Sequence, residues 1–170
     1  CYYVNKAYGN SKSYDILDEI DGKKVVYIDE KEFMDKTKLE TIKMGKNITI
    51  IERLAFSNCV NLSDIDLSNI AVIERNAFMD CKSLESVVLN AKDIYGGAFY
   101  DCSSLSKVTL NNTVTIGSFA FTGTVISEIV LPNTLYTIGV DAFYNCNYLS
   151  KIECHSNVLR SNEYLLSLGS

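Results

Sequence analysis

The chain has 170 residues, 47% of them hydrophobic, which is the size of one ordinary domain with enough apolar side chains for a continuous core. Its net charge of -5, without a cluster of Lys and Arg, argues against a nucleic-acid partner and against binding to an anionic membrane surface. The apolar runs are too short for a membrane-spanning helix, and the chain begins with Cys1 rather than Met, so we expect an excised or processed fragment.

Residues 1–31 are expected to cap the fold, and they allow two interpretations. Asp21-Gly22, placed between two segments that contain apolar residues, is typical of a β-hairpin. Leu17 and Ile20, with Ile28 eight residues after Ile20, instead match a degenerate half repeat of the unit described next. Either arrangement would cover the first core layer of a solenoid.

Residues 32–154 consist of one repeated unit. Phenylalanines recur at intervals of 21 to 23 residues, and a period in the low twenties is typical of a solenoid. Most copies read A-F-x-x-C and continue into an L-x-x-I-x-L phrase, and an isoleucine stands five residues before each phenylalanine. The phenylalanines are Phe33, Phe56, Phe78, Phe99, Phe121 and Phe143, and the isoleucines are Ile28, Ile51, Ile73, Ile94, Ile116 and Ile138.

Each L-x-x-I-x-L phrase predicts a short strand. In the copy around Ile65 and Leu67, these two side chains face the core, and Asp64 and Asp66 face outward. The strands of successive copies are expected to stack in parallel, about 4.8 Å apart. The isoleucine before each phenylalanine predicts a second, shorter extended segment, and the A-F-x-x-C segment predicts short helical turns. Glycines that follow this isoleucine, such as Gly117, predict a tight corner with a positive φ.

Residues 155–170 follow the last complete copy and also allow two interpretations. Ser161 is a candidate N-cap, and closely spaced apolar residues follow it, so this segment could be a short helix that caps the solenoid. If the segment is instead a truncated repeat, it leaves an apolar end. We therefore expect a monomer or weak end-to-end association.

The repeated pattern resembles the BspA-like class of leucine-rich repeats, whose consensus is roughly A-F-x-x-C-x-x-L-x-x-I-x-L-P. The resemblance covers about residues 28–154, with Thr124 and Lys36 at cysteine positions and a single Leu131-Pro132. It implies a right-handed leucine-rich-repeat solenoid of the α/β horseshoe class, with mostly short parallel strands. It also implies a cell-surface or secreted adhesin-like protein that binds host matrix proteins or proteins of partner cells.

Four cysteines occupy the same position of the unit and are expected to form a column, together with Thr124. Stacked side chains point in parallel directions, whereas a disulfide needs the two side chains turned toward each other. We therefore expect free, buried thiols that act as small hydrophobic groups. The four are Cys59, Cys81, Cys102 and Cys146.

The sequence offers little for catalysis or metal binding. Cys154 and His155 are adjacent on a predicted strand, so their side chains would point to opposite faces. One histidine and no C-x-x-C pair argue against a metal site, and the known nucleophile and phosphate-loop motifs are missing. The pair Asp64 and Asp66 fits a solvated strand face. We expect neither enzymatic activity nor a cofactor.

The candidate binding residues are therefore the outward positions of the predicted strands. A middle column places the mildly apolar Val88, Thr109 and Val130 at the centre of the sheet, where a solenoid offers an extended ligand surface. The same residues also simply suit strands, because they are β-branched. The candidates are Asp66, Val88, Thr109, Val130 and Glu153 in this column and Lys107, Glu128 and Lys151, which alternate in sign, in the column beside it.

We thus expect a non-enzymatic protein-binding module that uses the exposed strand face. The alternative is a structural spacer that presents another domain and has no ligand of its own.

Overall fold

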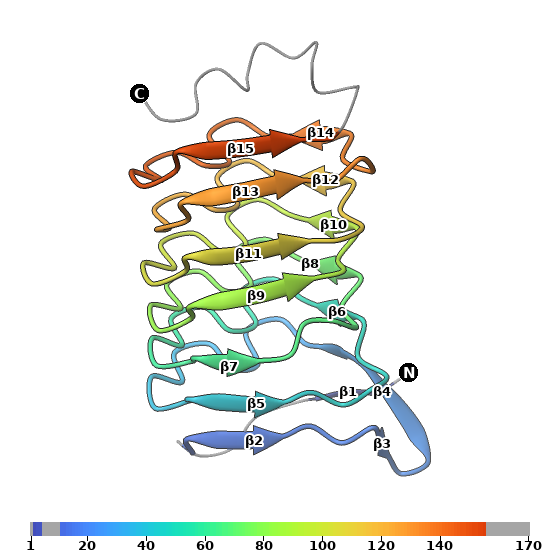
Figure 1. The fold of residues 1–170 in the computed structure, drawn as a ribbon. Coiled ribbons are helices and arrows are strands. Elements are labelled where there is room, and N and C mark those ends of the chain that lie inside the picture. The colour runs from blue at the N-terminus through green and yellow to red at the C-terminus, as the bar shows by residue number, and fades with distance from the viewer. Residues whose placement is uncertain (1, 5–10, 156–170) are drawn as a thin grey trace.

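The computed structural model describes residues 2–4 and 11–155, which form a parallel β-solenoid (Figure 1). One sheet runs through all the coils, where a coil is one circuit of the solenoid, and its strands from β4 to β14 are parallel and in register. In spatial order these strands are β1 (Tyr2–Val4), β4 (Lys23–Ile28), β6 (Ile50–Ile51), β8 (Val72–Ile73), β10 (Asp93–Ile94), β12 (Thr115–Ile116) and β14 (Thr137–Ile138). This long sheet contains the predicted isoleucine column. The leucine-rich-repeat solenoid is thus confirmed.

The predicted L-x-x-I-x-L strands form a second wall, the front wall, which faces the viewer in Figure 1. Its strands are β2 (Ser13–Asp15), β5 (Thr41–Lys43), β7 (Asp64–Ile65), β9 (Ser86–Leu89), β11 (Lys107–Leu110), β13 (Glu128–Leu131) and β15 (Lys151–Cys154). Unlike the long sheet, this wall is divided into β2-β5-β7, β9-β11 and β13-β15. Within the described residues, no ladder joins β7 to β9 or β11 to β13.

The segment before the first phenylalanine forms the hairpin. Strand β3 (Glu19–Ile20) pairs antiparallel with β4, and Asp21 and Gly22 form the two-residue turn with φ values of 51° and 71°. Both residues have positive φ, as a type I′ turn requires. Leu17 does not take the place of a repeat leucine, because this side chain is 62% exposed. Instead, β2 begins the front wall, with Tyr14 opposite Ile42.

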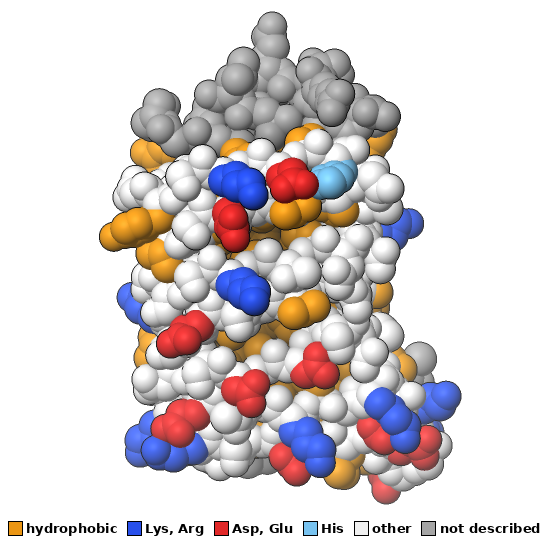
Figure 2. Space-filling view, in the orientation of Figure 1, with side chains coloured by type: hydrophobic (Ala, Val, Ile, Leu, Met, Phe, Trp, Pro, Cys, Tyr) orange, Lys and Arg blue, Asp and Glu red, His pale blue; other side chains and the backbone are white. Residues whose placement is uncertain are grey.

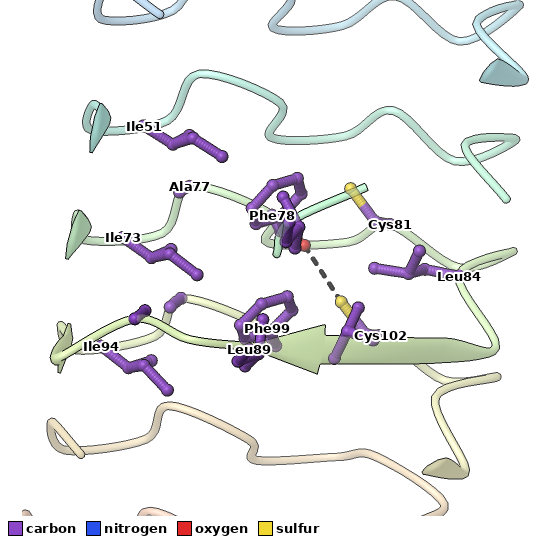
Figure 3. Packing of buried hydrophobic residues seen from close by; sticks show 14 of the residues in the cluster. Ile51, Ile73, Ala77, Phe78, Cys81, Leu84, Leu89, Ile94, Phe99 and Cys102 are labelled. Atoms are coloured by element: carbon purple, nitrogen blue, oxygen red, sulfur yellow. Dashed lines mark hydrogen bonds between the residues drawn. The ribbon is translucent and has the colours of Figure 1, made fainter. Parts of the chain in front are cut away.

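The core is a continuous stack of the six repeat phenylalanines. Neighbouring rings lie 5.0 to 5.4 Å apart between centroids, with interplanar angles of 2° to 9°, and all six side chains are buried. Figure 3 shows Phe78 and Phe99 one above the other, with the column of Ile51, Ile73 and Ile94 beside them. Equivalent residues of successive coils therefore share one interior, as the sequence period predicted.

The segments around these phenylalanines are hydrogen-bonded turns and not the predicted short helical turns. In the coil of Phe99, successive turns are closed by bonds from the N–H of Tyr100 to the carbonyl of Gly97 and from the N–H of Cys102 to that of Phe99. A left-handed residue lies two positions before and two positions after every repeat phenylalanine, and such residues interrupt a right-handed helix. No described residue belongs to a helix, so none forms a membrane-spanning helix.

These left-handed residues turn backbone N–H groups along the solenoid axis. In the coil of Phe56, the N–H groups of Leu54, Phe56 and Asn58 donate to carbonyls of the next coil, at 3.1, 2.7 and 2.7 Å. The same three-bond pattern recurs at every coil up to that of Phe121. The turns are therefore joined coil to coil by backbone hydrogen bonds, as strands are in a sheet. We call this set of bonds the axial ladder.

The predicted positive φ at the glycine after the column isoleucine is wrong. Gly117 and Gly139 have ordinary backbone angles, and their role is steric. A Cβ at Gly117 would lie 2.5 Å from the backbone nitrogen of Gly96, and one at Gly139 would lie 2.2 Å from that of Ser118. Glycine is needed here because the coils approach each other closely.

Replacement of Phe99 by alanine tests the central stack. Phe99 is fully buried between Phe78 and Phe121, so Phe99→Ala should lower the free energy of unfolding by about 3 to 5 kcal/mol. Chemical denaturation measures this loss. Tyr148→Ala, at a side chain that is 67% exposed, is the control and should change stability by less than about 0.5 kcal/mol. Equal effects of the two changes would contradict the proposed core.

Candidate binding surface

The structure places the predicted apolar strip on the outside of the front wall. Val88 and Val130 are 51% and 49% exposed, and Thr109 is half-buried beside Val88, its partner in the β9-β11 ladder. Figure 2 shows that the charged side chains of this face are scattered, with hydrophobic side chains visible between and beneath them. Valines exposed to this extent gain little from burial, so the strip is available for contact.

The strip is less continuous than the sequence predicted. Thr109 and Val130 lie on opposite sides of the break between β11 and β13, while Val130 pairs with Glu153 of β15. Asp66 lies beyond the other break, after β7. Hydrogen bonds from the Ser68 side chain and backbone N–H hold the pKa of Asp66 below its ordinary value. The Asp66 carboxylate thus accepts hydrogen bonds within a local turn, and it is separated from the other candidate residues.

The break between β11 and β13 opens a recess of about 670 Å³ that sequence reasoning missed. It accompanies a shortened turn, since Ile126 follows Phe121 by five residues, whereas Leu105 follows Phe99 by six. Lys107, Glu128 and Lys151, three of the predicted candidates, line this recess together with Thr109 and Val130. The structure therefore brings five of the eight predicted residues to one place.

The alternating charges beside the strip pair only in part. Lys151 lies 3.9 Å from Glu128 and 3.8 Å from Glu153, but no described acidic group lies within 4.0 Å of the Lys107 ammonium. The recess separates β11 from β13, which accounts for this difference. All of these side chains are exposed, so each pair contributes less than about 1 kcal/mol.

The cysteine column is buried and its thiols are free, as predicted. The thiols also hydrogen-bond, which the sequence did not indicate. Each donates to the backbone carbonyl of the phenylalanine in the preceding coil, at 3.0 to 3.2 Å, as Figure 3 shows for Cys102 and Phe78. Thr124 bonds the carbonyl of its own Phe121 instead, at 2.8 Å. Burial raises the pKa of all four thiols, that of Cys59 to about 12.

The described residues contain no group of three His, Cys, Asp or Glu side chains placed to hold a metal ion. Cys154, predicted to be in the core, is half-buried at its edge. The imidazole Nε2 of His155 lies 2.8 Å from a carboxylate oxygen of Glu153. The predicted C-terminal helix or truncated repeat lies outside the described residues.

A second surface feature was also missed by sequence reasoning. A groove of about 750 Å³ runs over the coils of Phe78, Phe99, Phe121 and Phe143, and it shares no lining residue with the front-wall recess. Its floor contains four glycines: Gly96, Gly97, Gly117 and Gly139. Tyr95, Tyr100 and Phe119 line its sides. The available signal was the Gly96-Gly97 pair, which removes two consecutive side chains from the coil surface.

The sequence matches the model of the BspA type leucine rich repeat region in six copies, over residues 7–115 and 114–168. These ranges cover most of the chain, and they include the coils described above. The chain therefore belongs to the family of BspA-type leucine-rich repeat proteins, which confirms the resemblance read from the sequence.

The solved structures that resemble this fold include the following two. A leucine rich cell surface protein from Faecalibacterium prausnitzii A2-165 is 26% identical, with a TM-score of 0.77 over 91% of this chain and 50% of that one. A leucine rich repeat protein from T. pallidum is 23% identical, with a TM-score of 0.63 over 88% of this chain and 62% of that one. The chain thus spans about half to three fifths of the length of these neighbours. No curated protein matches it.

The buried thiols predict a loss of stability at alkaline pH. Burial raises the pKa of the Cys59 thiol from 9.0 to about 12, so the unfolded chain loses this proton at lower pH than the folded chain. The stabilisation is complete below pH 9 and is lost as pH rises toward 12. Within this window the Cys59 thiol should lower the free energy of unfolding by about 1.4 kcal/mol per pH unit.

Denaturant unfolding of Cys59→Thr at several pH values isolates the contribution of this thiol from the contributions of all other ionisable groups. The replacement follows Thr124, which already occupies the column. Above pH 9 the stability of the variant should decline less steeply than that of the wild type. Identical slopes would mean that the Cys59 thiol ionises as readily in the folded chain as in the unfolded one.

Proposed function

We propose that the chain is a non-enzymatic protein-binding module of a bacterial cell-surface protein, and that it binds through the front wall. Family membership and the similarity to a leucine rich cell surface protein support this reading. The observation that carries it is the exposed strip of Val88, Thr109 and Val130, set beside a recess in the front wall.

The front wall has the composition of a protein contact surface. An apolar centre with a polar, charged rim is typical of protein interfaces, and here Lys107, Glu128 and Lys151 form such a rim beside the valines. Because the rim carries both signs of charge, it favours a partner with complementary charges of both signs over a uniformly charged polymer. The recess adds a concave place for a partner side chain.

The finer proposal is an adhesin-like role, in which the partner is a host matrix protein or a protein of another cell. Extended solenoid surfaces suit such partners because one wall offers contact residues from several coils at once. Secretion or attachment to the cell surface belongs to the same proposal.

Aspartate substitution in the strip tests the front wall. Val88→Asp combined with Val130→Asp places two charges where apolar contact is proposed, and should weaken binding to a matrix protein at least about tenfold. Binding to immobilised collagen, laminin and fibronectin is measured for the wild type and the double variant. The melting temperature should change little, because both valines are half exposed.

Val140→Asp is the matched control, since Val140 is 55% exposed and lies outside the front wall. It should bind as the wild type does. If the wild type and the double variant behave alike, or if no protein partner is retained from a matrix extract, the chain is instead a spacer that presents another domain.

A further inference from the structure

The groove over the glycine-rich coils has the chemistry of a polysaccharide site, and we propose that it binds an acidic glycan whose sugars carry uronic-acid carboxylates. This ligand is distinct from the protein partner proposed for the front wall. The groove lies where β10 and β12 lead into the turns that precede Phe99 and Phe121.

The groove lies where neighbouring coils pass close to each other. A Cβ at Gly96 would lie 3.1 Å from the carbonyl oxygen of Ser118, and one at Gly97 would lie 2.1 Å from Oδ1 of Asn76, so these positions need glycine. Tyr95, Tyr100 and Phe119 line the groove together with these glycines. Tyr95 and Phe119 are 38% and 43% exposed, so their rings are accessible to a ligand. Flat aromatic rings around a shallow hollow suit the apolar face of a pyranose ring.

Phe119 occupies a position that does not favour an aromatic residue. Its φ is 60°, in the left-handed region, where a bulky side chain raises the energy of the backbone. The equivalent position holds Gly97 in the preceding coil and Asp141 in the following one, and both suit this conformation better. Because the ring is also exposed, core packing does not compensate for the strain. A contact with a ligand would account for the phenylalanine.

The floor of the groove offers unused hydrogen-bond donors. In the part of the chain that the structure describes, the backbone N–H groups of Gly96 and Ser118 have no acceptor. Gly117 and Gly139 of the following coils pass close to these two nitrogens, since a Cβ at Gly117 would lie 2.5 Å from the Gly96 nitrogen and one at Gly139 would lie 2.2 Å from the Ser118 nitrogen. Thr115, a further lining residue, adds a hydroxyl group nearby. Sugar hydroxyls and carboxylates are the acceptors that such donors can bind.

The charge of the groove indicates an anion. Arg75 is the one charged residue that lines it, and its guanidinium has no ion-pair partner among the described residues. Glu74, the next residue toward the N-terminus, does not line the groove. A carboxylate can accept two parallel hydrogen bonds from a guanidinium, which makes this pairing strong and directional. The charge of the Arg75 guanidinium therefore favours an acidic ligand in this groove.

A glycan fits the groove better than a peptide does. Peptides commonly bind a sheet by adding a strand to its edge, but β10 and β12 are each paired on both sides. The coils under the groove repeat every 5.2 to 5.4 Å, as measured between the stacked phenylalanine rings. This repeat is comparable to the length of one sugar unit in an extended chain, so successive sugars can lie over successive coils.

Calorimetric titration with a hyaluronate octasaccharide, in which carboxylate-bearing and neutral sugars alternate, tests the proposal. The wild type should bind it, and Arg75→Gln and Phe119→Asn should each weaken binding about tenfold or more, because each removes one of the proposed contacts. Asparagine tolerates the left-handed conformation, so Phe119→Asn should unfold at the same temperature as the wild type or higher.

Two controls separate the groove from the rest of the molecule. Leu54→Asn also introduces asparagine at a left-handed position two residues before a repeat phenylalanine, but in the coil of Phe56, outside the groove. Lys107→Gln removes a charge from the front wall. Both should bind the octasaccharide as tightly as the wild type. The proposal is overturned if the wild type does not bind, or if the groove variants and the controls lose affinity equally. It is also overturned if hexaglutamate binds equally tightly and depends on the same two groove residues, because the ligand would then be an acidic peptide.

Discussion

The axial ladder is the constraint on which the rest of the structure depends. The N–H of each phenylalanine from Phe33 to Phe121 donates to an alanine carbonyl of the next coil, at 2.7 to 2.8 Å. These bonds fix the spacing of the coils along the solenoid axis. This spacing stacks the phenylalanine rings face to face, and it brings each column thiol within hydrogen-bonding distance of a carbonyl of the preceding coil. The long sheet holds one side of each coil in the same way. The axial ladder thus satisfies many backbone groups of the turns without helices.

Side chains that repeat made the interior predictable from sequence. Phe56 and Ile51 recur with a fixed spacing, and each repetition marks the same place in the coil, so their burial and stacking could be read directly. Features that depend on the distance between backbones could not be read in this way. The breaks in the front wall leave no composition signal, and the left-handed positions are held by residues as different as Lys31 and Phe119. Gly117 was noticed for the wrong reason, since close approach and backbone freedom both select glycine.

The two candidate surfaces arise where the coils depart from regularity. In the coil of Phe121, the turn is one residue short and Thr124 replaces the column cysteine, and β13 then lies apart from β11. In the neighbouring coil, Gly96 and Gly97 replace the longer side chains found in the same positions elsewhere. The regular coils hold these local changes in place, because each is bonded to its neighbours on both sides. Rigid support for a variable surface is the general advantage of repeat proteins.

The free thiols also set the conditions under which this fold can form. Within the described coils no disulfide closes any loop, and the column cysteines are held by burial and by hydrogen bonds to carbonyls. Folding of these coils therefore needs no disulfide formation, and a reducing medium breaks no covalent cross-link in them. Many small exported domains depend on oxidation to hold their shape. A solenoid of this kind would keep the same structure in an anaerobic, strongly reducing medium.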